Sequence, residues 1–424
     1  MAAWDRAKLG DLVETQKGYA FKSGWYCNAG RPIVKVSDFT DDAVDSTKLM
    51  CIPESTATDY LKYELRTGDV VVQTVGSWPT NPASVVGKCV RIPGEAAGAL
   101  LNQNAVKLTP AGKFDRTFLF YLLRNEDFKT YIISTAQGAA SQAAITLEAI
   151  RGYEFSLPPL PIQRRIAGIL SAYDELIENS QRRIKILESM ARGLYREWFV
   201  HFRFPGHESV PRVPSPLGEI PKGWEVVSID DVCSRVTDGS HRSPPSVDDG
   251  MPMASSKDMH DWGLNLDTAR LIGPEDFADL VRNDCKPKKN DVLITKDGAN
   301  YLKYIFVTRA EQEVVLLSSV AMLRPNARIN PHLLVATLKE PENKGKLKNY
   351  VTGAAIPRVI LKDFKRFQLL LPGKEVQMAW AKVAEPMTEQ IWRLIDTIQN
   401  LRRTRDLLLP RLLSGQIDVE AIAS

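Results

Sequence analysis

Several residues of this chain have types and spacings that suit phosphate or metal chemistry, but none of them completes a catalytic motif. Four Gly-Lys pairs lack the upstream glycine of a GxxxxGK[ST] phosphate loop. Two Asp-Phe-Lys triplets, at residues 127–129 and 363–365, match half of a nuclease motif, and we favour solvated charges at helix ends as their explanation. The histidines show no HExxH or other metal-ligand spacing. We therefore expect the chain to have no active site and no metal site of its own.

The chain carries one pattern twice, about half a chain apart. The run TGDVVV at residues 67–72 returns as KNDVLI at 289–294, and NAVKLTP at 104–110 returns as SVAMLRP at 319–325. Solenoid repeats are several-fold shorter than this spacing. The repeat therefore predicts two globular domains of similar fold.

Within the first copy, short β-rich runs are bounded by Gly, Pro, Asn or Asp, which is typical of strands. We expect strands at residues 33–36, 70–74, 85–90 and 105–108. The apolar run at 118–123, together with the residues after it, indicates one helix. This mixture predicts an α+β domain.

Two apolar stripes with steps of three or four residues follow the two copies. The first runs from Ile166 to Trp198 and includes Leu176, and the second runs from Val383 to Leu408. A helix over residues 163–199 would be roughly 55 Å long at about 1.5 Å per residue. Because one long amphipathic helix cannot cover its own stripe, we expect the two helices to pair antiparallel. The alternative is that each helix packs on its own domain or on a partner protein.

The composition restricts the class of protein without identifying it. The 424 residues are 44% hydrophobic and 25% charged, with a formal net charge of +4. This charge is compatible with nucleic-acid binding but does not by itself indicate it. Five widely spaced cysteines suggest neither a disulfide framework nor a zinc site. The sequence has no run of eighteen apolar residues and no signal-peptide pattern at its start, so we expect a cytoplasmic location.

Three segments of the chain resemble the specificity subunits of Type I restriction-modification enzymes. LPRLLSGQI at residues 409–417 resembles the C-terminal signature of that family. LPPLPIQRRI at 157–166 is similar to the start of its conserved helix, and SMARGLYREWF at 189–199 to the end of that helix. The resemblance covers essentially the whole chain. It departs at residues 371–375, which lack the second proline pair, and at Arg164, where the family often has an acidic residue.

The resemblance implies an α+β fold in which two similar DNA target-recognition domains are separated by a pair of long antiparallel coiled-coil helices. Each domain would read one half of a bipartite site in double-stranded DNA, and the helices would set the spacing and dock two methyltransferase subunits. Restriction/translocase subunits would join that core. The chain itself would be non-catalytic and bind no cofactor, since S-adenosylmethionine, ATP and magnesium would belong to the partner subunits.

The expected organisation follows from the repeat and the helices. It consists of a first target-recognition domain at residues 1–157, a first long helix at 158–205, a proline-rich linker at 206–223, a second target-recognition domain at 224–371, and a second long helix with a C-terminal tail at 372–424.

Three loops in each domain have the composition that DNA reading requires. Base edges are read by amide, hydroxyl and guanidinium groups, and phosphates are held by Lys, Arg and backbone amides. The loops lie at residues 16–23, 73–78 and 137–142, and at 237–243, 295–301 and 352–358. The candidate contacts are Lys17, Tyr19, Lys22, Gln73, Thr74, Ser77, Gln142, Ser240, His241, Arg242, Thr295, Lys296, Asn300, Tyr301 and Arg358. For each loop, the alternative is an ordinary solvated turn.

Cationic residues that we expect to be exposed on the two helices leave three roles open. They could form a solvated face, a phosphate track or an edge that docks a partner, and the residues concerned are Arg182, Arg183, Lys185, Arg402, Arg403 and Arg405. At the level of the whole chain, the competing function is a stand-alone DNA-binding regulator or scaffold with a coiled-coil spacer. The closing LPRLLSG run disfavours that alternative.

Overall fold

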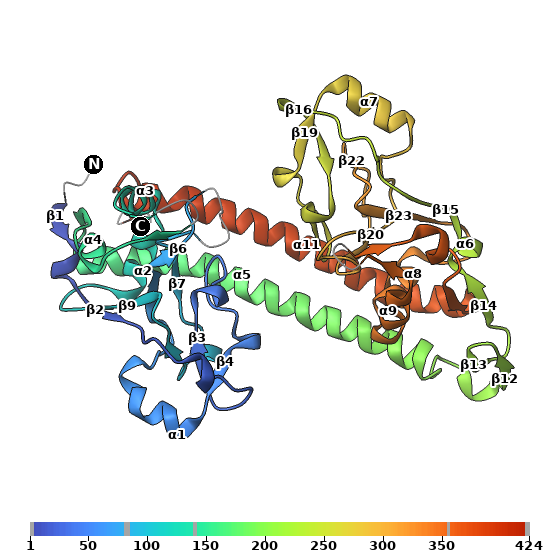
Figure 1. Ribbon diagram of the computed structural model, residues 1–424, viewed down its shortest axis with the longest axis horizontal. Helices are drawn as coiled ribbons and strands as arrows, with labels where there is room; N and C mark the ends of the chain where they lie inside the picture. The colour runs from blue at the N-terminus through green and yellow to red at the C-terminus, as the bar shows by residue number, and fades with distance from the viewer. Residues whose placement is uncertain (1–3, 80–84, 139–141, 354–356, 420–424) are drawn as a thin grey trace. The chain divides into compact units, whose positions relative to one another are not determined.

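The computed structural model describes residues 4–79, 85–138, 142–353 and 357–419, which divide into two units with separate cores. Unit 1 comprises residues 1–179 and 397–424, and unit 2 comprises residues 180–396. Two long helices, α5 (Leu160–Tyr195) and α11 (Lys374–Leu413), each contribute one half to each unit (Figure 1).

Unit 1 is built around a four-stranded antiparallel sheet in the order β2-β9-β5-β7. A second sheet has the order β4-β3-β8, and β1 pairs with β11. The strands are β1 (Asp5–Lys8), β2 (Val13–Lys17), β3 (Arg31–Val34), β4 (Met50–Ile52), β5 (Val70–Gln73), β6 (Val75–Gly76), β7 (Cys89–Arg91), β8 (Leu100–Leu101), β9 (Ala105–Pro110), β10 (Ala143–Ala144) and β11 (Glu154–Leu157). The helices are α1 (Glu54–Ala57), α2 (Arg116–Arg124), α3 (Glu126–Ser134) and α4 (Leu147–Arg151).

Unit 2 repeats this topology strand for strand in its main sheets. The order β15-β23-β20-β21 corresponds to β2-β9-β5-β7, β19-β16-β22 to β4-β3-β8, and β14-β26 to β1-β11. Its strands are β12 (Arg212–Ser215), β13 (Gly218–Pro221), β14 (Glu225–Ser228), β15 (Cys233–Asp238), β16 (Ser246–Ala254), β17 (Met259–His260), β18 (Gly263–Leu264), β19 (Arg270–Ile272), β20 (Val292–Thr295), β21 (Ile305–Val307), β22 (Val315–Leu316), β23 (Val320–Pro325), β24 (Val351–Thr352), β25 (Arg358–Val359) and β26 (Gln368–Leu371). The helices are α6 (Ile229–Val232), α7 (Pro274–Arg282), α8 (Pro331–Lys339), α9 (Pro341–Leu347) and α10 (Leu361–Phe364). The predicted pair of similar α+β domains is confirmed.

One buried glutamine fixes the start of each long helix. The Gln163 side chain in α5 donates to the carbonyl of Pro158 and accepts from the backbone N–H of Asp115, which caps α2. Gln377 in α11 donates to the carbonyl of Pro372 and accepts from the N–H of Asn330, the cap of α8. Each glutamine satisfies backbone groups that a helix start leaves without partners. The second helix therefore begins in the same way as the first, although its proline pair is missing.

Within each unit, the local halves of α5 and α11 pack against one another. In unit 1, Ile166 and Leu170 share a core with Leu409 and Leu412. In unit 2, Tyr195 at the end of α5 shares a core with Trp380 near the start of α11. Residues early in α5 thus meet residues late in α11, as the predicted antiparallel pairing requires. Two stripe positions differ from the prediction, since Leu176 and Val383 are 55% and 41% exposed.

The helix cations also differ from the prediction at one position. Arg405 is 3% exposed, and its guanidinium lies 2.5 Å from Asp174 and 3.5 Å from Asp42. The Tyr121 hydroxyl donates to Asp174 at 2.5 Å. Burial lowers the pKa of Arg405, but these carboxylates outweigh that effect and raise it overall. Placing Arg405 among the exposed charges was wrong, because its position on α11 faces α5 and the loop at residues 40–43.

Several segments have a different secondary structure from the one expected. The strand expected at residues 33–36 is β3, which ends at Val34, and the one expected at 85–90 is β7, which begins only at Cys89. The helix predicted from residue 118 onward is two helices, α2 and α3, because Asn125 has an extended backbone and its side chain caps α3. Residues 212–221, within the expected linker, form the hairpin β12–β13, and Ile220 at its end is buried beside Trp224. In the described part of the chain, no helix is both long and apolar enough to cross a membrane.

Candidate nucleic-acid interface

Sheet topology brings the three predicted loops of unit 1 to one end of its main sheet. β2 and β5 flank β9 and both run antiparallel to it, so Lys17 and Gln73 end their strands side by side across β9. The pairing of β6 with β10 then joins the third loop to the second, and the N–H of Ile145 donates to the carbonyl of Thr74 at 2.9 Å.

Unit 2 places its three loops in the same way. β15 and β20 flank β23, with Asp238 opposite Ala321 and Thr295 opposite Val320. The third loop reaches the second through β25, where the N–H of Val359 donates to the carbonyl of Lys296. Residues 139–141 and 354–356, which include most of the repeated Gly-Ala-Ala, lie outside the described residues.

In both units, the residue directly after the first strand of the main sheet is a glycine, which lets the backbone of the first loop pass very close to the backbone of another segment. A Cβ added to Gly18 would lie 2.1 Å from the carbonyl oxygen of Asn102, and one added to Gly239 would lie 2.2 Å from that of Leu316. Only glycine allows a backbone approach this close. Tyr19 and Ser240, which follow these glycines, are therefore held at fixed positions beside the ends of β8 and β22.

The candidate contacts of unit 1 divide by exposure. Lys17, Lys22 and Gln142 are exposed, and Tyr19 is partly exposed. The side chains of Gln73, Thr74 and Ser77 are buried, at 0%, 4% and 9% exposure. In this conformation those three cannot reach a base edge, and Gln73 instead donates to the carbonyl of Val75 and shapes the second loop.

Sequence reasoning missed an aromatic cluster around Tyr19. The Tyr19 ring lies 4.4 Å from the Tyr60 ring and 5.4 Å from the Tyr63 ring, measured between centroids. The Lys62 ammonium lies 4.9 Å from the Tyr63 ring, and Lys22 lies over Trp25 at 5.3 Å. The signal was present as a lysine between two tyrosines at residues 60–63. Clustered aromatic rings beside lysines are suited to contact with nucleic acid, because bases stack on such rings.

The loops of unit 2 are joined by ion pairs. The Lys296 ammonium, 3% exposed, contacts the Asp238 carboxylate of the first loop, which also accepts from the exposed His241 ring. Asp297 lies 3.3 Å from the guanidinium of Arg358 in the third loop, and burial raises the pKa of Asp297. Lys296 is therefore committed to holding the loops together, whereas the Arg358 side chain remains 59% exposed.

The other candidates of unit 2 have structural partners as well. Arg242 is exposed but pairs with Asp276 and Asp279 of α7, at 2.6 and 3.4 Å. The buried Ser240 hydroxyl donates to the carbonyl of Arg242, and the buried Thr295 hydroxyl accepts from the N–H groups of Lys303 and Tyr304. Asn300 and Tyr301 are partly exposed.

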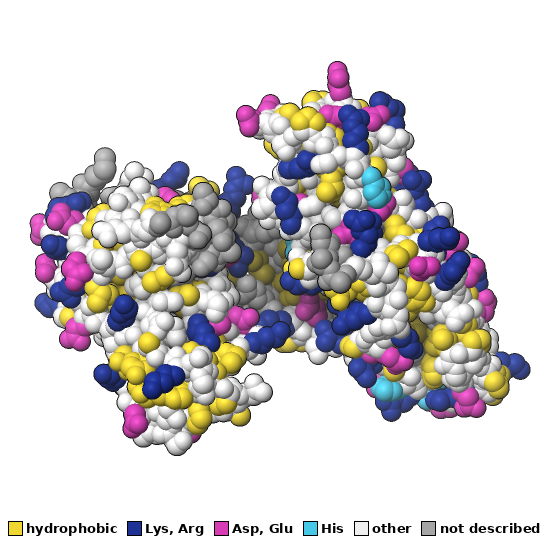
Figure 2. Space-filling view, viewed as in Figure 1, with side chains coloured by type: hydrophobic (Ala, Val, Ile, Leu, Met, Phe, Trp, Pro, Cys, Tyr) yellow, Lys and Arg dark blue, Asp and Glu magenta, His cyan; other side chains and the backbone are white. Residues whose placement is uncertain are grey.

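The surface charge agrees with the small net charge of the chain. On the face shown in Figure 2, Lys and Arg side chains are scattered over each unit and alternate with Asp and Glu. Among the described residues, no group of three or more His, Cys, Asp or Glu side chains is placed to hold a metal ion. On this face, the described residues form no broad basic surface.

Comparisons with known proteins agree with this architecture. A family model described as the Type I restriction modification DNA specificity domain matches residues 1–189 and 221–401. A putative type I restriction enzyme MjaX specificity subunit of Methanocaldococcus jannaschii is 26% identical over 439 residues, covering 98% of this chain and 94% of its own. The EcoBI specificity subunit of Escherichia coli is 21% identical over 420 residues, covering 94% of this chain and 81% of its own.

A solved structure shares the fold. The S subunit of a Type-I restriction-modification system from M. genitalium aligns with a TM-score of 0.55 at 16% identity, covering 96% of each chain. The family match spans both copies of the repeat, and both copies have the same sheet topology. This chain therefore belongs to the family of Type I restriction-modification DNA specificity subunits and has two target-recognition domains.

Proposed function

We propose that each unit reads one half of a bipartite target in double-stranded DNA, with its three loops at one end of the main sheet. The observation that carries this proposal is the repeated placement of loops after β2 and β5, and after β15 and β20, on identical topologies. A shared scaffold with different loop side chains suits the reading of two different short sequences, because side chains at groove edges carry the sequence information.

The exposed loop residues have distinct roles in this proposal. In unit 1, Lys17, Lys22 and Lys62 would bind phosphates beside the Tyr19 ring, and Gln142 would face bases. In unit 2, Arg358 would contact a base edge or a phosphate, oriented by its ion pair with Asp297. The buried Gln73 and Lys296 would act by holding the loops in place.

We further propose that the chain supplies specificity and no catalysis. Two methyltransferase subunits would dock on α5 and α11, and restriction/translocase subunits would join them. S-adenosylmethionine, ATP and magnesium would be bound by those partners. In support, α5 exposes apolar side chains one helical turn apart, with Ile186 at 58% and Met190 at 52% exposure. Exposed apolar side chains in such a row are typical of a partner surface.

The test is co-expression with the modification subunit of the same restriction-modification system, followed by mapping of methylated bases in host DNA. We expect methylation within a site whose two specified halves are separated by unspecified base pairs. A continuous target would contradict the two-reader proposal. Methylation by this chain expressed alone would contradict the proposal that it is non-catalytic. A stand-alone regulator, the alternative function, would bind DNA without directing any methylation.

A further inference from the structure

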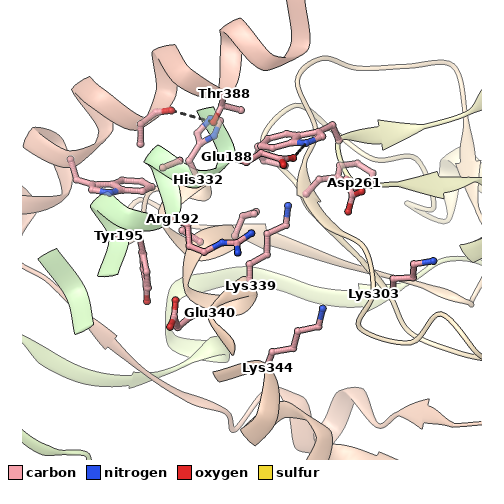
Figure 3. A pocket seen from close by; sticks show the side chains of 18 residues that line it. Glu188, Arg192, Tyr195, Asp261, Lys303, His332, Lys339, Glu340, Lys344 and Thr388 are labelled. Carbon is pink, nitrogen blue, oxygen red and sulfur yellow. Dashed lines mark hydrogen bonds between the residues drawn. The ribbon is translucent and has the colours of Figure 1, made fainter. Parts of the chain in front are cut away.

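A cavity of about 320 Å³ lies within unit 2 (Figure 3). Its walls come from the second half of α5, the turn between β17 and β18, the segment leading into β21, helices α8 and α9, and the first half of α11. Apolar side chains of Phe306, Val335 and Ala384 line one part of it. A space of this volume is large enough for a small organic molecule.

Four cationic side chains line the same cavity: Arg192, Lys303, Lys339 and Lys344. In Figure 3 the Arg192 guanidinium and the Lys339 side chain converge on the middle of the space. Among the described residues, none of the four has a carboxylate oxygen within 4 Å that would form an ion pair with it. Lys339 is largely buried and lies over the Trp262 ring at 4.7 Å. Burial lowers the pKa of Lys339, which an anion beside it would reverse.

Two of the three acidic side chains of the lining have partners outside the four cations. Glu188 accepts a hydrogen bond from the Trp262 indole at 2.6 Å, and Glu340 lies 3.4 Å from the Arg196 guanidinium. Of the lining carboxylates, Asp261 is the exposed one. With Glu340 paired to Arg196, the four cations of the lining face two carboxylates, Glu188 and Asp261, so the net charge is positive and favours an anionic group.

Two buried polar atoms of the lining have no hydrogen-bond partner among the described residues. They are the indole nitrogen of Trp380, a residue 2% exposed, and Oε2 of Glu340, a residue 7% exposed. Buried polar groups are nearly always paired, so an unpaired donor and an unpaired acceptor in one cavity each call for an explanation. A ligand that has both an acceptor and an N–H or O–H donor would satisfy both.

We propose that this cavity is a binding site for a small organic anion, with a phosphate or carboxylate held by Lys339, Lys344 and Arg192 and a planar, largely apolar body against Trp380 and Phe306. A nucleoside monophosphate has this chemistry, including donor groups for Glu340. The lining residues lie outside residues 237–243, 295–301 and 352–358, although Lys303 closely follows the second loop, so the proposal does not depend on the function proposed for those loops.

The probe is adenosine monophosphate, titrated into the full-length protein and followed by calorimetry and by tryptophan fluorescence. We expect saturable binding at one site per chain, with adenosine and inorganic phosphate each at least about tenfold weaker, since each keeps only part of the contacts. The double variant Lys339→Gln, Lys344→Gln is expected to weaken binding at least about tenfold through loss of charge-assisted hydrogen bonds. The matched control is Lys346→Gln, because Lys346 lies on the same helix as Lys344 but outside the lining and is paired with Glu342.

A second variant keeps the test decisive if the double variant does not fold. Trp380→Phe removes the indole donor while keeping an aromatic ring, and a several-fold weakening of adenosine monophosphate binding is expected. Equal affinities of wild type and both variants would overturn the proposal, as would an equal loss in Lys346→Gln. Competition by duplex DNA would also overturn it, because the cations would then belong to the DNA interface. Retained binding of adenosine monophosphate in the complex with modification subunits would support the proposal. Loss of that binding would overturn it and would place the cavity in the contact with those subunits.

Discussion

Exposure separates the loop residues into those that hold a loop and those that face outward. Gln73, Thr295 and Lys296 have the donors and acceptors that base reading needs, yet each lies at the end of a central strand and is almost fully buried. The same chemistry serves the protein itself, as in the ion pair of Lys296 with Asp238. Burial, which depends on the neighbouring strands, decides between the two uses.

Arg358 is the outward-facing residue whose role can be tested most directly. Arg358→Ala is expected to weaken DNA binding by about 1–3 kcal/mol, the usual range for loss of a specific arginine contact. The preference at the other half-site should not change, because that half is read by the loops of unit 1. Binding is measured with the modification subunits present, on DNA with either half-site altered.

Arg366→Ala is the matched control for that measurement. The Arg366 side chain is 73% exposed. The carbonyl of its neighbour Lys365 accepts a hydrogen bond from the N–H of Asp230, which precedes β15. Arg366 therefore lies near the start of β15, whereas Asp238 and the recognition loop lie at the end of that strand. If Arg358→Ala and Arg366→Ala bind DNA as tightly as wild type, Arg358 is not at the interface.

At the scale of elements, the helix pair is joined to its unit by buried charges as well as by apolar packing. In unit 1, Arg405 on α11 contacts Asp174 on α5 and Asp42 in the loop before β4. Arg124 of α2 also contacts Asp42, at 2.5 Å. One cluster thus connects both long helices with the recognition domain, and removing one member would leave a buried charge unpaired.

Arg405→Ala is expected to reduce the free energy of unfolding of unit 1 by about 3 kcal/mol, the cost of breaking a buried ion pair from one side. Calorimetry or urea unfolding measures this change. Arg403→Ala, at an exposed position on the same helix, should change it by less than about 0.5 kcal/mol. Equal small effects of the two changes would contradict the role given to Arg405.

The same cluster predicts a dependence on pH. Burial raises the pKa of Asp42, but Arg124, Arg405 and Arg402 outweigh it and lower the pKa overall. Because the folded value lies below the unfolded value of about 3.9, the stabilising contribution is present above that pH and is lost as the pH falls through the folded value. The stability difference between wild type and Asp42→Asn should therefore be larger at pH 7 than at about pH 3. An unchanged difference would argue against ionised Asp42.

The exposed apolar row on α5 carries a separate expectation about docking. The double variant Ile186→Asp, Met190→Asp should no longer co-purify with the methyltransferase subunit, because two charges would be buried in an apolar contact. Leu217→Asp is the control, since Leu217 is also exposed, at 40%, but lies in the β12–β13 turn. Undiminished co-purification of the double variant would place the docking surface elsewhere.

For the whole molecule, the central feature is that each set of recognition loops is built on its own sheet and core. Both main sheets have the same order and the same glycine after their first strand, at Gly18 and Gly239. The units can therefore diverge in loop side chains without disturbing one another. Changes in the two sets of loops should act independently.

Tyr19→Ala and Arg358→Ala test this independence. The free-energy losses of DNA binding should add in the double variant to within about 0.5 kcal/mol, as for sites that share no partners. The measurement is the affinity of wild type, both single variants and the double variant for the full target at one salt concentration, because salt alters all such affinities. A clear departure from additivity would mean that the two readers are coupled.

Much of this architecture could be predicted from particular residues. The repeat of the runs at residues 67–72 and 289–294 predicted two similar domains, and the three- and four-residue spacing predicted both long helices. The break between α2 and α3 could not be predicted, because a single Asn125 with an extended backbone interrupts an otherwise continuous apolar pattern. Ile220 gave too little local signal to reveal a hairpin that depends on packing against Trp224.

The sequence by itself determined the duplicated domains, the helix pair and the candidate loops, because periodicity and repetition are local properties that one chain displays directly. Only the tertiary structure decided which loop residues are free to bind. It buried Gln73 and Lys296, enclosed Arg405 between helices and joined Tyr19 to Tyr60. Exposure and pairing arise from contacts between residues far apart in the chain, and no local pattern encodes them.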